Sequence, residues 1–175
     1  MAQTPIPPEE INVNDKIIFW TPKRIARMAI FIAISAVGAM IKVPSPTGTV
    51  ALDASIAYFS AIAFGWREGC IVAALGHMLT ALTTGFPLSF PLHVFVALQM
   101  AVWVSLFEII AHKIHMWVGV IVAVLLNGPV SSLLVIPVGG WGLTAALILP
   151  LTIGSIINVL VAVSAYLIIN KSKMI

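Results

Sequence analysis

The stretch GHMLTALTTGFPLSFPLH, residues 76–93, places polar and helix-breaking residues between two strongly apolar runs. It contains a histidine at each end, two prolines, two glycines and four threonine or serine residues. Proline and glycine in such a cluster end helices and form turns. The stretch therefore predicts the end of one apolar helix, a loop and the start of the next helix. The solvent around those helices decides what the polar residues do.

Composition indicates that this solvent is a lipid bilayer. Hydrophobic residues make up 61% of the 175 residues and charged residues only 9%, whereas a soluble domain has about 25% charged residues. We therefore expect an integral membrane protein with a single domain. The net charge of +3 predicts no nucleic-acid partner, and one cysteine, Cys70, supports neither a disulfide framework nor a CxxC metal site.

Six hydrophobic segments follow one another and predict an all-α fold of six transmembrane helices. Thr21 suits the N-cap of the first helix and Pro22 its first turn. The second segment is short, and by length alone it could be a buried or re-entrant helix. Residues 22–170 would form the membrane domain, between an N-terminal segment, 1–21, and a C-terminal tail, 171–175. The expected helices cover residues 22–43, 54–65, 68–84, 92–110, 116–138 and 143–170.

Basic residues are distributed unequally between the two ends of these segments. With six spans, both termini lie on one side of the membrane, and only Lys42 falls on the opposite side. Because loops rich in Lys and Arg stay in the cytoplasm, the termini are predicted to be cytoplasmic. The eight basic residues on the predicted cytoplasmic side are Lys16, Lys23, Arg24, Arg27, Arg67, Lys113, Lys171 and Lys173.

The N-terminal segment PEEINVNDKIIFW, residues 8–20, mixes charged and apolar side chains. It predicts either an amphipathic helix along the cytoplasmic interface or a flexible tail. Lys23, Arg24 and Arg27 precede an apolar run, as in a signal peptide, but the segment before that run is too long for an n-region. We therefore expect the first helix to be retained.

Polar side chains gather in the outer half of the expected helices. His77, Thr80 and Thr84 recur at helical spacing, so they share one face that leads to the loop. Asn127 and Ser131 share a face in the same way. Since polar groups in a bilayer usually face a bundle interior or a cavity, the pattern predicts a pocket open to the outside. The candidate ligand-binding residues are Asp53, His77, Thr80, Thr84, Phe86, His93, Gln99, Asn127, Ser131, Trp141, Ser155 and Asn158.

Several of these residues also have a local explanation that the sequence leaves open. Thr80 and Thr84 could bond their own helix backbone, and Asp53 could cap the second helix. Asn127 could satisfy the backbone groups that Pro129 leaves unpaired. Taken together, these explanations do not account for the concentration of polar residues in one half of the membrane.

Motifs for catalysis are absent from the sequence. It has no Walker A pattern, no HExxH and no GxSxG, which argues against ATP hydrolysis and against the corresponding hydrolases. His77 and His93 could share a metal, but no acid or cysteine at suitable spacing completes a site. We therefore expect no enzyme, no cofactor and no bound metal.

The first helix carries small residues at regular spacing. Ala29 and Ala33 form a small-xxx-small pair, which permits close approach of another helix. The pair predicts either packing within the bundle or a docking face for a separate membrane protein.

The order of these features resembles that of the substrate-binding S-components of energy-coupling factor (ECF) vitamin transporters. The shared features are six spans, cytoplasmic termini, the Ala29 and Ala33 pair, and the loop VPSPTGTVALD, residues 43–53, before a short second helix. The resemblance covers nearly the whole chain from about residue 22. It implies a vitamin pocket near the outer face and a location in the plasma membrane of a prokaryote. It also implies that Ala29 and Ala33 contact a transmembrane coupling protein with two ATPases, which explains the missing nucleotide motif.

Three segments point to a substrate within that family. KVPSPTGTVALD, GHMLTALTTGFPLSFPLH and NGPV, starting at residues 42, 76 and 127, look like those of S-components assigned to α-ribazole, a cobamide precursor. Phe86, Phe90 or Trp141 could stack on the benzimidazole, and the polar candidates could bond the ribose hydroxyls. The same groups suit riboflavin, pyridoxine or pantothenate. Strongly anionic vitamins are disfavoured, because Lys42 is the only basic residue on the predicted outer side that could balance their charge.

Three other classes of protein remain open at this stage. A stand-alone transporter or channel would move solute without ATPase partners, and a membrane enzyme would convert its ligand. A non-catalytic subunit of a larger complex would bind no small molecule. The lack of a polar path through the cytoplasmic half disfavours a channel.

Overall fold

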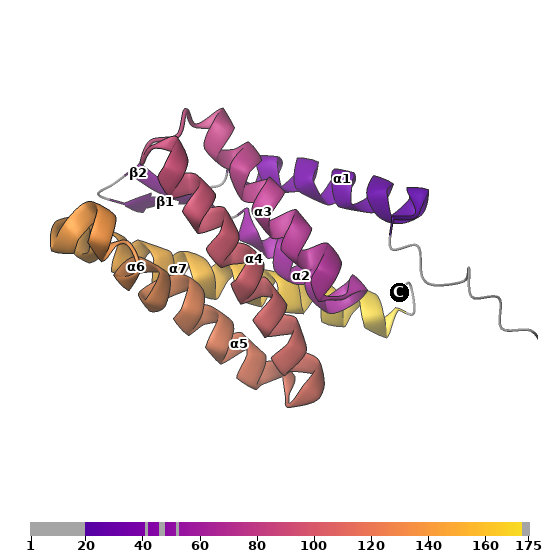
Figure 1. The fold of residues 1–175 in the computed structure, drawn as a ribbon. Coiled ribbons are helices and arrows are strands. Elements are labelled where there is room, and N and C mark those ends of the chain that lie inside the picture. The colour runs from indigo at the N-terminus through magenta and orange to yellow at the C-terminus, as the bar shows by residue number, and fades with distance from the viewer. Residues whose placement is uncertain (1–19, 41, 46–47, 52, 173–175) are drawn as a thin grey trace, which may run out of the picture.

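The structure is a computed structural model, and it describes residues 20–40, 42–45, 48–51 and 53–172. Most of the predicted N-terminal segment, residues 1–19, and of the C-terminal tail, residues 173–175, lies outside these described residues. The described chain is a bundle of helices with one small β-hairpin (Figure 1). The elements are α1 (Pro22–Gly38), β1 (Lys42–Ser45), β2 (Gly48–Ala51), α2 (Ala54–Phe64), α3 (Trp66–Thr83), α4 (Phe90–Lys113), α5 (Met116–Leu125), the π-helix η2 (Leu126–Val130), α6 (Ser131–Leu133) and α7 (Ile136–Lys171).

Three stretches of helix in the described chain are long and apolar enough to cross a membrane. They are Phe90–Lys113, Met116–Leu133 and Ile136–Lys171, and α2 is a shorter apolar helix. The helix α1 has 17 residues and α3 has 18. The helical class and the apolar character are as predicted, whereas the six spans and the side of the termini stay a prediction.

The segment between α1 and α2 corrects the sequence-based expectation. We expected the first helix to continue to residue 43, followed by an irregular loop, but α1 ends at Gly38 and an antiparallel hairpin follows. Its register pairs Lys42 with Ala51 and Ser45 with Gly48. Proline is tolerated in edge strands, and both strands of a two-stranded sheet are edges. Pro44 in β1 is therefore compatible with the strand.

The later helices depart from regular α geometry at two places, near Pro129 and at Gly140. Pro129 lies in η2, where the helix widens from α to π geometry because proline removes a backbone donor. Gly140 has a φ of 67°, a left-handed conformation that glycine adopts without strain and that interrupts α7. The fifth predicted helix ends at Leu133 rather than at residue 138, and the sixth begins at Ile136 rather than at residue 143, with a kink at Gly140.

The helix α3 occupies the middle of the bundle and packs against α1, α2 and α4. Its approach to α2 depends on Gly69, because a Cβ atom at this position would lie 2.4 Å from the Ala61 Cβ. The core of the bundle forms around Tyr58 on α2 and Phe107 on α4, whose rings meet edge to face at 5.2 Å.

We expect Gly69→Ala to destabilise the protein by about 1–3 kcal/mol, because the added methyl group forces α2 and α3 apart. The free energy of unfolding in detergent measures the effect. Gly142→Ala is the matched control, since a Cβ at Gly142 meets no atom within 4 Å. Equal stability of the two variants would contradict the close packing of α2 on α3.

A buried ion pair joins α1 to α3 at the end of the bundle opposite the hairpin. The Glu68 side chain is 1% exposed, and Arg27 donates to both of its carboxylate oxygens. The Arg24 Nε lies 3.4 Å from the same carboxylate, and the Arg27 guanidinium stacks 3.8 Å above the Phe64 ring centroid. From the sequence alone, these arginines predict only which end of the helices faces the cytoplasm.

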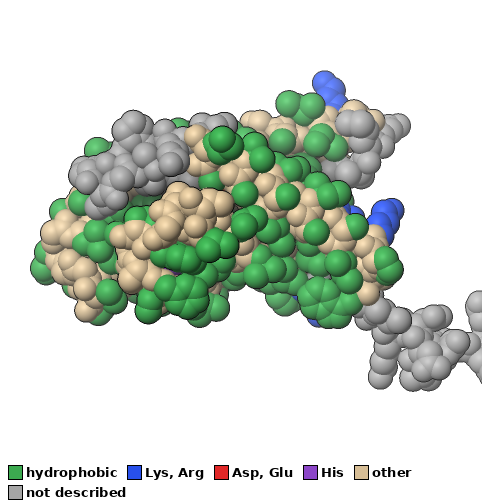
Figure 2. Space-filling model, turned by 90° about the horizontal axis from the view of Figure 1, so that it is seen from above, with side chains coloured by type: hydrophobic (Ala, Val, Ile, Leu, Met, Phe, Trp, Pro, Cys, Tyr) green, Lys and Arg blue, Asp and Glu red, His purple; other side chains and the backbone are tan. Residues whose placement is uncertain are grey.

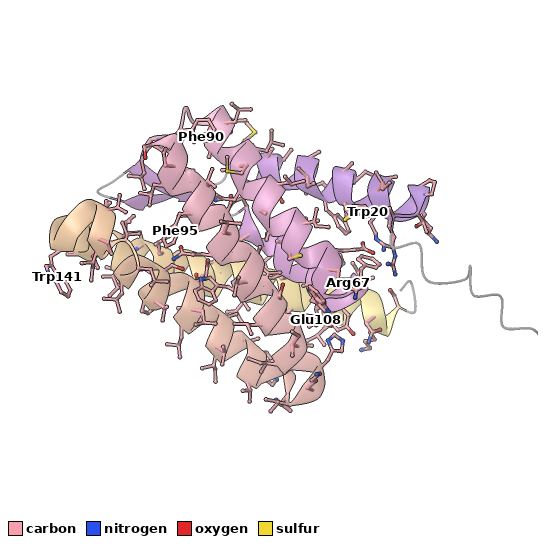
Figure 3. All side chains as sticks on the ribbon, viewed as in Figure 1. Trp20, Arg67, Phe90, Phe95, Glu108 and Trp141 are labelled. Atoms are coloured by element: carbon pink, nitrogen blue, oxygen red, sulfur yellow. The ribbon has the colours of Figure 1, made fainter. Side chains whose placement is uncertain are left out.

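The face of the bundle in Figure 2 carries many hydrophobic side chains, and its visible Lys and Arg side chains lie toward one end. Figure 3 shows Trp20, Arg67 and Glu108 toward one end of the molecule, and Phe90 and Trp141 toward the other. Exposed side chains such as Leu98 (62%) and Leu149 (66%) would be costly in water. Such a surface is suited to lipid.

Candidate functional site

A cavity of about 360 Å³ lies between α2, α3, α4, η2 and α7. This volume is in the range of small-molecule sites, about 300–1,000 Å³. Met100 and Ala54 belong both to its wall and to the hydrophobic core, so the core closes the cavity on one side. A second group of buried side chains, Leu92, Val135 and Leu147, packs along another part of its wall.

Ten of the twelve predicted site residues, all except Phe86 and Trp141, line this single cavity. They come from five regions far apart in the sequence, which the fold brings together. The ten residues are Asp53, His77, Thr80, Thr84, His93, Gln99, Asn127, Ser131, Ser155 and Asn158.

Sequence reasoning missed the apolar part of the lining. Helical spacing could have indicated some of it: Leu92, Val96 and Met100 follow one another at i, i+4 and i+8 beside His93. The apolar lining residues, with one glycine, are Ala39, Ala54, Ala81, Pro87, Leu88, Leu92, Val96, Met100, Val135, Leu147, Leu151 and Gly154.

Asp53, His77 and His93 form a row along the cavity wall. The Asp53 Oδ2 lies 3.8 Å from the His77 Nδ1, and the His77 Nε2 lies 3.2 Å from the His93 Nδ1. The first distance is too long for a hydrogen bond, whereas the second is within hydrogen-bonding range. The Asp53 side chain makes no capping hydrogen bond to α2. Its position beside His77 favours an electrostatic interaction with that histidine over a capping role.

Four buried polar atoms around the cavity have no hydrogen-bond partner among the described residues. They are the Thr80 Oγ1, the His93 Nε2, and both the Nε2 and the Oε1 of Gln99. Buried polar groups are nearly always hydrogen-bonded, so a cluster of unpartnered ones needs an explanation. A polar ligand in the cavity would provide the missing partners.

The remaining polar residues of the cavity are held by the protein itself. Asn127 donates its Nδ2 to the Ser155 Oγ at 2.7 Å, which joins η2 to α7. Asn158 accepts from the Ser55 backbone N–H at 2.8 Å, which joins α7 to α2. The Ser131 Oγ accepts from the Trp103 Nε1 at 2.9 Å. These bonds fix the cavity wall before any ligand enters.

The local explanations weighed for the sequence are resolved differently at different residues. The Thr84 hydroxyl donates to the backbone oxygens of Thr80 and Ala81, as expected for a threonine near a helix end. The Thr80 hydroxyl makes no such bond. The Asn127 side chain bonds Ser155 and not the backbone that Pro129 disturbs.

Phe86 and Trp141 lie outside the cavity lining. The Phe86 ring packs against the rings of His93 and Phe90, with centroids 5.7 Å and 5.2 Å away. Phe86 has a φ of 52°, an unusual conformation for a residue with a side chain. The Phe86 ring therefore contacts His93 without lining the cavity. Trp141 is 71% exposed on the surface.

The electrostatic character of the cavity is mildly acidic. Asp53 is the only Asp, Glu, Lys or Arg among its described lining residues. An anionic ligand would meet no Lys or Arg side chain among the described lining residues. Such a ligand would bind poorly, because a buried charge without a partner of opposite sign is costly. No group of three or more potential metal ligands is found among the described residues.

Ala29 and Ala33 lie on the exposed face of α1. The neighbouring side chains Ile30 and Ile34 are 57% and 41% exposed on the same helix. The opposite face of α1, with Met28 and Ser35, packs against the bundle. The small-residue pair is therefore not used for packing among the described residues of this chain.

Comparison with known proteins gives one family and one fold. The family model described as "ECF transporter, substrate-specific component" matches residues 23–170. A solved structure described as the S component of a bacterial ECF transporter superposes with a TM-score of 0.63 at 20% sequence identity, covering 87% of this chain and 95% of that chain. At this identity the likeness shows the fold. No curated protein sequence matches the chain significantly.

Proposed function

The chain belongs to the family of ECF transporter substrate-specific components, and we propose that it captures a neutral, ring-containing vitamin or vitamin precursor, with α-ribazole as the first choice. Members of this family are membrane proteins that bind a small molecule and work with a coupling protein and ATPase subunits. The observation that carries the proposal is the cavity with four unpartnered polar atoms and no lining Lys or Arg among its described residues.

The chemistry of α-ribazole matches the two kinds of lining. Its methylated benzimidazole is flat and apolar, which suits the wall formed by Leu88, Leu92 and Val96. Its ribose hydroxyls both donate and accept hydrogen bonds, as required opposite Gln99 and His93. Stacking on Phe86 or Trp141 has no support, because both lie outside the lining. The imidazole rings of His77 and His93 are the planar side chains among the described lining residues on which the benzimidazole could stack.

Other vitamins fit the cavity less closely or equally well. Riboflavin and pyridoxine are polar ring compounds and compete on the same grounds. Pantothenate carries a carboxylate, which would meet Asp53 and no basic side chain among the described lining residues. The ordering of substrates therefore rests on charge first and on shape second.

The proposed orientation places the cavity toward the outside of the cell. The hairpin and the loop of Pro87 and Leu88 are at its end of the bundle, while Arg27, Arg67 and Lys113 belong to the other end, where basic residues favour the cytoplasm. The proposed coupling face is α1 around Ala29 and Ala33, which is exposed and apolar.

Equilibrium binding to the purified full chain tests the proposal. The panel contains α-ribazole, riboflavin, pyridoxine and pantothenate, each titrated by calorimetry onto ligand-free protein in detergent. We expect α-ribazole to bind most tightly and pantothenate to bind weakly or not at all. Tight binding of pantothenate would contradict the charge argument, and failure of α-ribazole to bind would remove it as the substrate.

Replacement of Ala33 by Trp tests the coupling face. We expect complex formation with the co-expressed coupling protein and ATPases to weaken about ten- to hundredfold, because a large side chain overpacks the helix contact by about 1–3 kcal/mol. Ligand binding to the isolated chain should not change. Leu98→Trp, at an exposed position on α4, is the control. Equal complex formation by both variants would remove the α1 face from the interface.

A further inference from the structure

Three titratable side chains line the cavity in the described part of the chain, and they stand in a row. Asp53 faces the His77 Nδ1 at 3.8 Å, and the His77 Nε2 faces the His93 Nδ1 at 3.2 Å. The last atom of the row, the His93 Nε2, is buried and has no partner among the described residues. His93 itself is 8% exposed.

The row leaves two ways to place the hydrogens when both imidazoles are neutral. A neutral imidazole carries one N–H and one bare nitrogen, and the bond between the rings needs one hydrogen. If His77 donated that hydrogen from Nε2, its bare Nδ1 lone pair would face the Asp53 carboxylate. If His93 donates it from Nδ1, the His77 N–H points toward the carboxylate.

Charge decides between the two arrangements. A carboxylate attracts the hydrogen of an N–H and repels a nitrogen lone pair, and the attraction is stronger in a site shielded from water. No other charged side chain is among the described lining residues that could oppose Asp53. The arrangement with hydrogens on both Nδ1 atoms is therefore favoured, and it leaves the His93 Nε2 bare.

We propose that Asp53 is a positioning residue that acts through His77 to make the His93 Nε2 a hydrogen-bond acceptor. The cavity then selects ligands that present an O–H or N–H donor at this point. This inference rests on the proposed binding function and adds to it the polarity of one contact. A ribose hydroxyl meets the requirement, whereas an ether, a carbonyl or a ring nitrogen without hydrogen does not.

The nitrogen-15 NMR spectrum of the histidine-labelled full chain tests the row without any ligand. At a pH of about 8, where an ordinary imidazole is neutral, we expect the Nε2 of both His77 and His93 to give the signal of a bare, pyridine-type nitrogen. Asp53→Ala should produce a mixture of the two tautomers, and Asp53→Glu should restore the single form. A protonated His93 Nε2 in the wild type, or unchanged tautomers in Asp53→Ala, would overturn the inference.

Glu108→Ala provides the matched control for the spectrum. Glu108 Oε1 lies 3.4 Å from the Nδ1 of His112, an exposed histidine outside the cavity. Removal of this carboxylate should leave the His77 and His93 signals as they are. A change in those signals in Glu108→Ala would show that the tautomers respond to general disturbance, and would count against the row.

Binding of fluorinated probes then tests the contact itself. The probes are α-ribazole and its three deoxyfluoro analogues, in which one ribose hydroxyl is replaced by fluorine, which cannot donate. We expect one analogue to bind the wild type about tenfold more weakly than α-ribazole does, as for the loss of one hydrogen bond. The same analogue should bind His93→Ala no more weakly than it binds the wild type. Asp53→Ala should weaken α-ribazole by a similar factor.

The outcomes separate the two proposals. If α-ribazole does not bind but the spectrum shows the expected tautomers, the substrate of the proposed function is wrong and the row stands. If α-ribazole binds and all three analogues bind as tightly, the donor requirement at His93 is wrong while the binding function stands.

Discussion

Replacement of Gln99 by Leu is expected to remove most ligand binding and, at the same time, to stabilise the ligand-free protein. Both side-chain amide atoms of Gln99 are buried at the cavity without a partner among the described residues. Two hydrogen bonds to a ligand, each of about 2 kcal/mol including the unsatisfied partner, amount to a loss of about a thousandfold in affinity. Calorimetric titration of the ligand onto the variant measures this loss.

The stability change has the opposite sign because neither amide atom of Gln99 has a hydrogen-bond partner among the described residues, and leucine removes both polar atoms from the buried site. Leucine has a similar size and no polar atoms, so we expect the free energy of unfolding to rise by about 1–3 kcal/mol. Ser105→Ala on the same helix is the control, since the Ser105 hydroxyl bonds the Ala101 backbone oxygen away from the cavity. A Gln99→Leu protein that is less stable and still binds would place Gln99 in a structural role.

Arg27→Ala is expected to cause the largest loss of stability, about 3 kcal/mol or more. The substitution removes both Arg27 hydrogen bonds from the Glu68 carboxylate, which is 1% exposed, and leaves the more distant Arg24 Nε at 3.4 Å. A buried charge that loses its main partner is strongly destabilising. Unfolding of the purified protein in detergent measures the effect, and the affinity for ligand in the folded fraction should not change, because none of these residues lines the cavity.

Two further variants isolate the charge effect from lost packing. Arg67→Ala removes an exposed arginine at the start of α3, next to Glu68, and should cost less than about 1 kcal/mol. Adding Glu68→Gln to Arg27→Ala should recover part of the loss, because an amide leaves no uncompensated charge. If the double variant were as unstable as the sum of the two single variants, the ion pair would not hold α1 to α3.

Much of the helical framework could be predicted from the sequence, because apolar runs and their breaks have direct physical consequences. The N-cap at Thr21 is confirmed, whereas the boundary between the fifth and sixth predicted helices lies at residues 134–135 and not at 139–142. The hairpin of β1 and β2 was missed because proline was taken only as a helix breaker. The ion pair between Arg27 and Glu68 was missed, because a count of basic residues predicts the side of the membrane on which they lie and not the residues that they contact.

The candidate site shows the same division. Residues on helices, such as His77 and Gln99, could be brought to one cavity by helical spacing alone. The two aromatic residues that the sequence placed in loops could not, because the direction of a loop side chain depends on backbone angles that the sequence does not reveal. Phe86, with its positive φ, points to His93 and not into the cavity, and Trp141 lies on the surface beside the kink at Gly140.

The most direct test of the central claim, that the cavity holds a small neutral molecule, is native mass spectrometry of the purified full chain. We expect the wild type and Ser105→Ala to release one small molecule that is neutral in solution, and Gln99→Leu to release none. Release of α-ribazole would also identify the substrate. A wild-type chain that releases no molecule and binds none of the four vitamins of the panel, or a Gln99→Leu chain that retains the ligand fully, would contradict this account of the cavity.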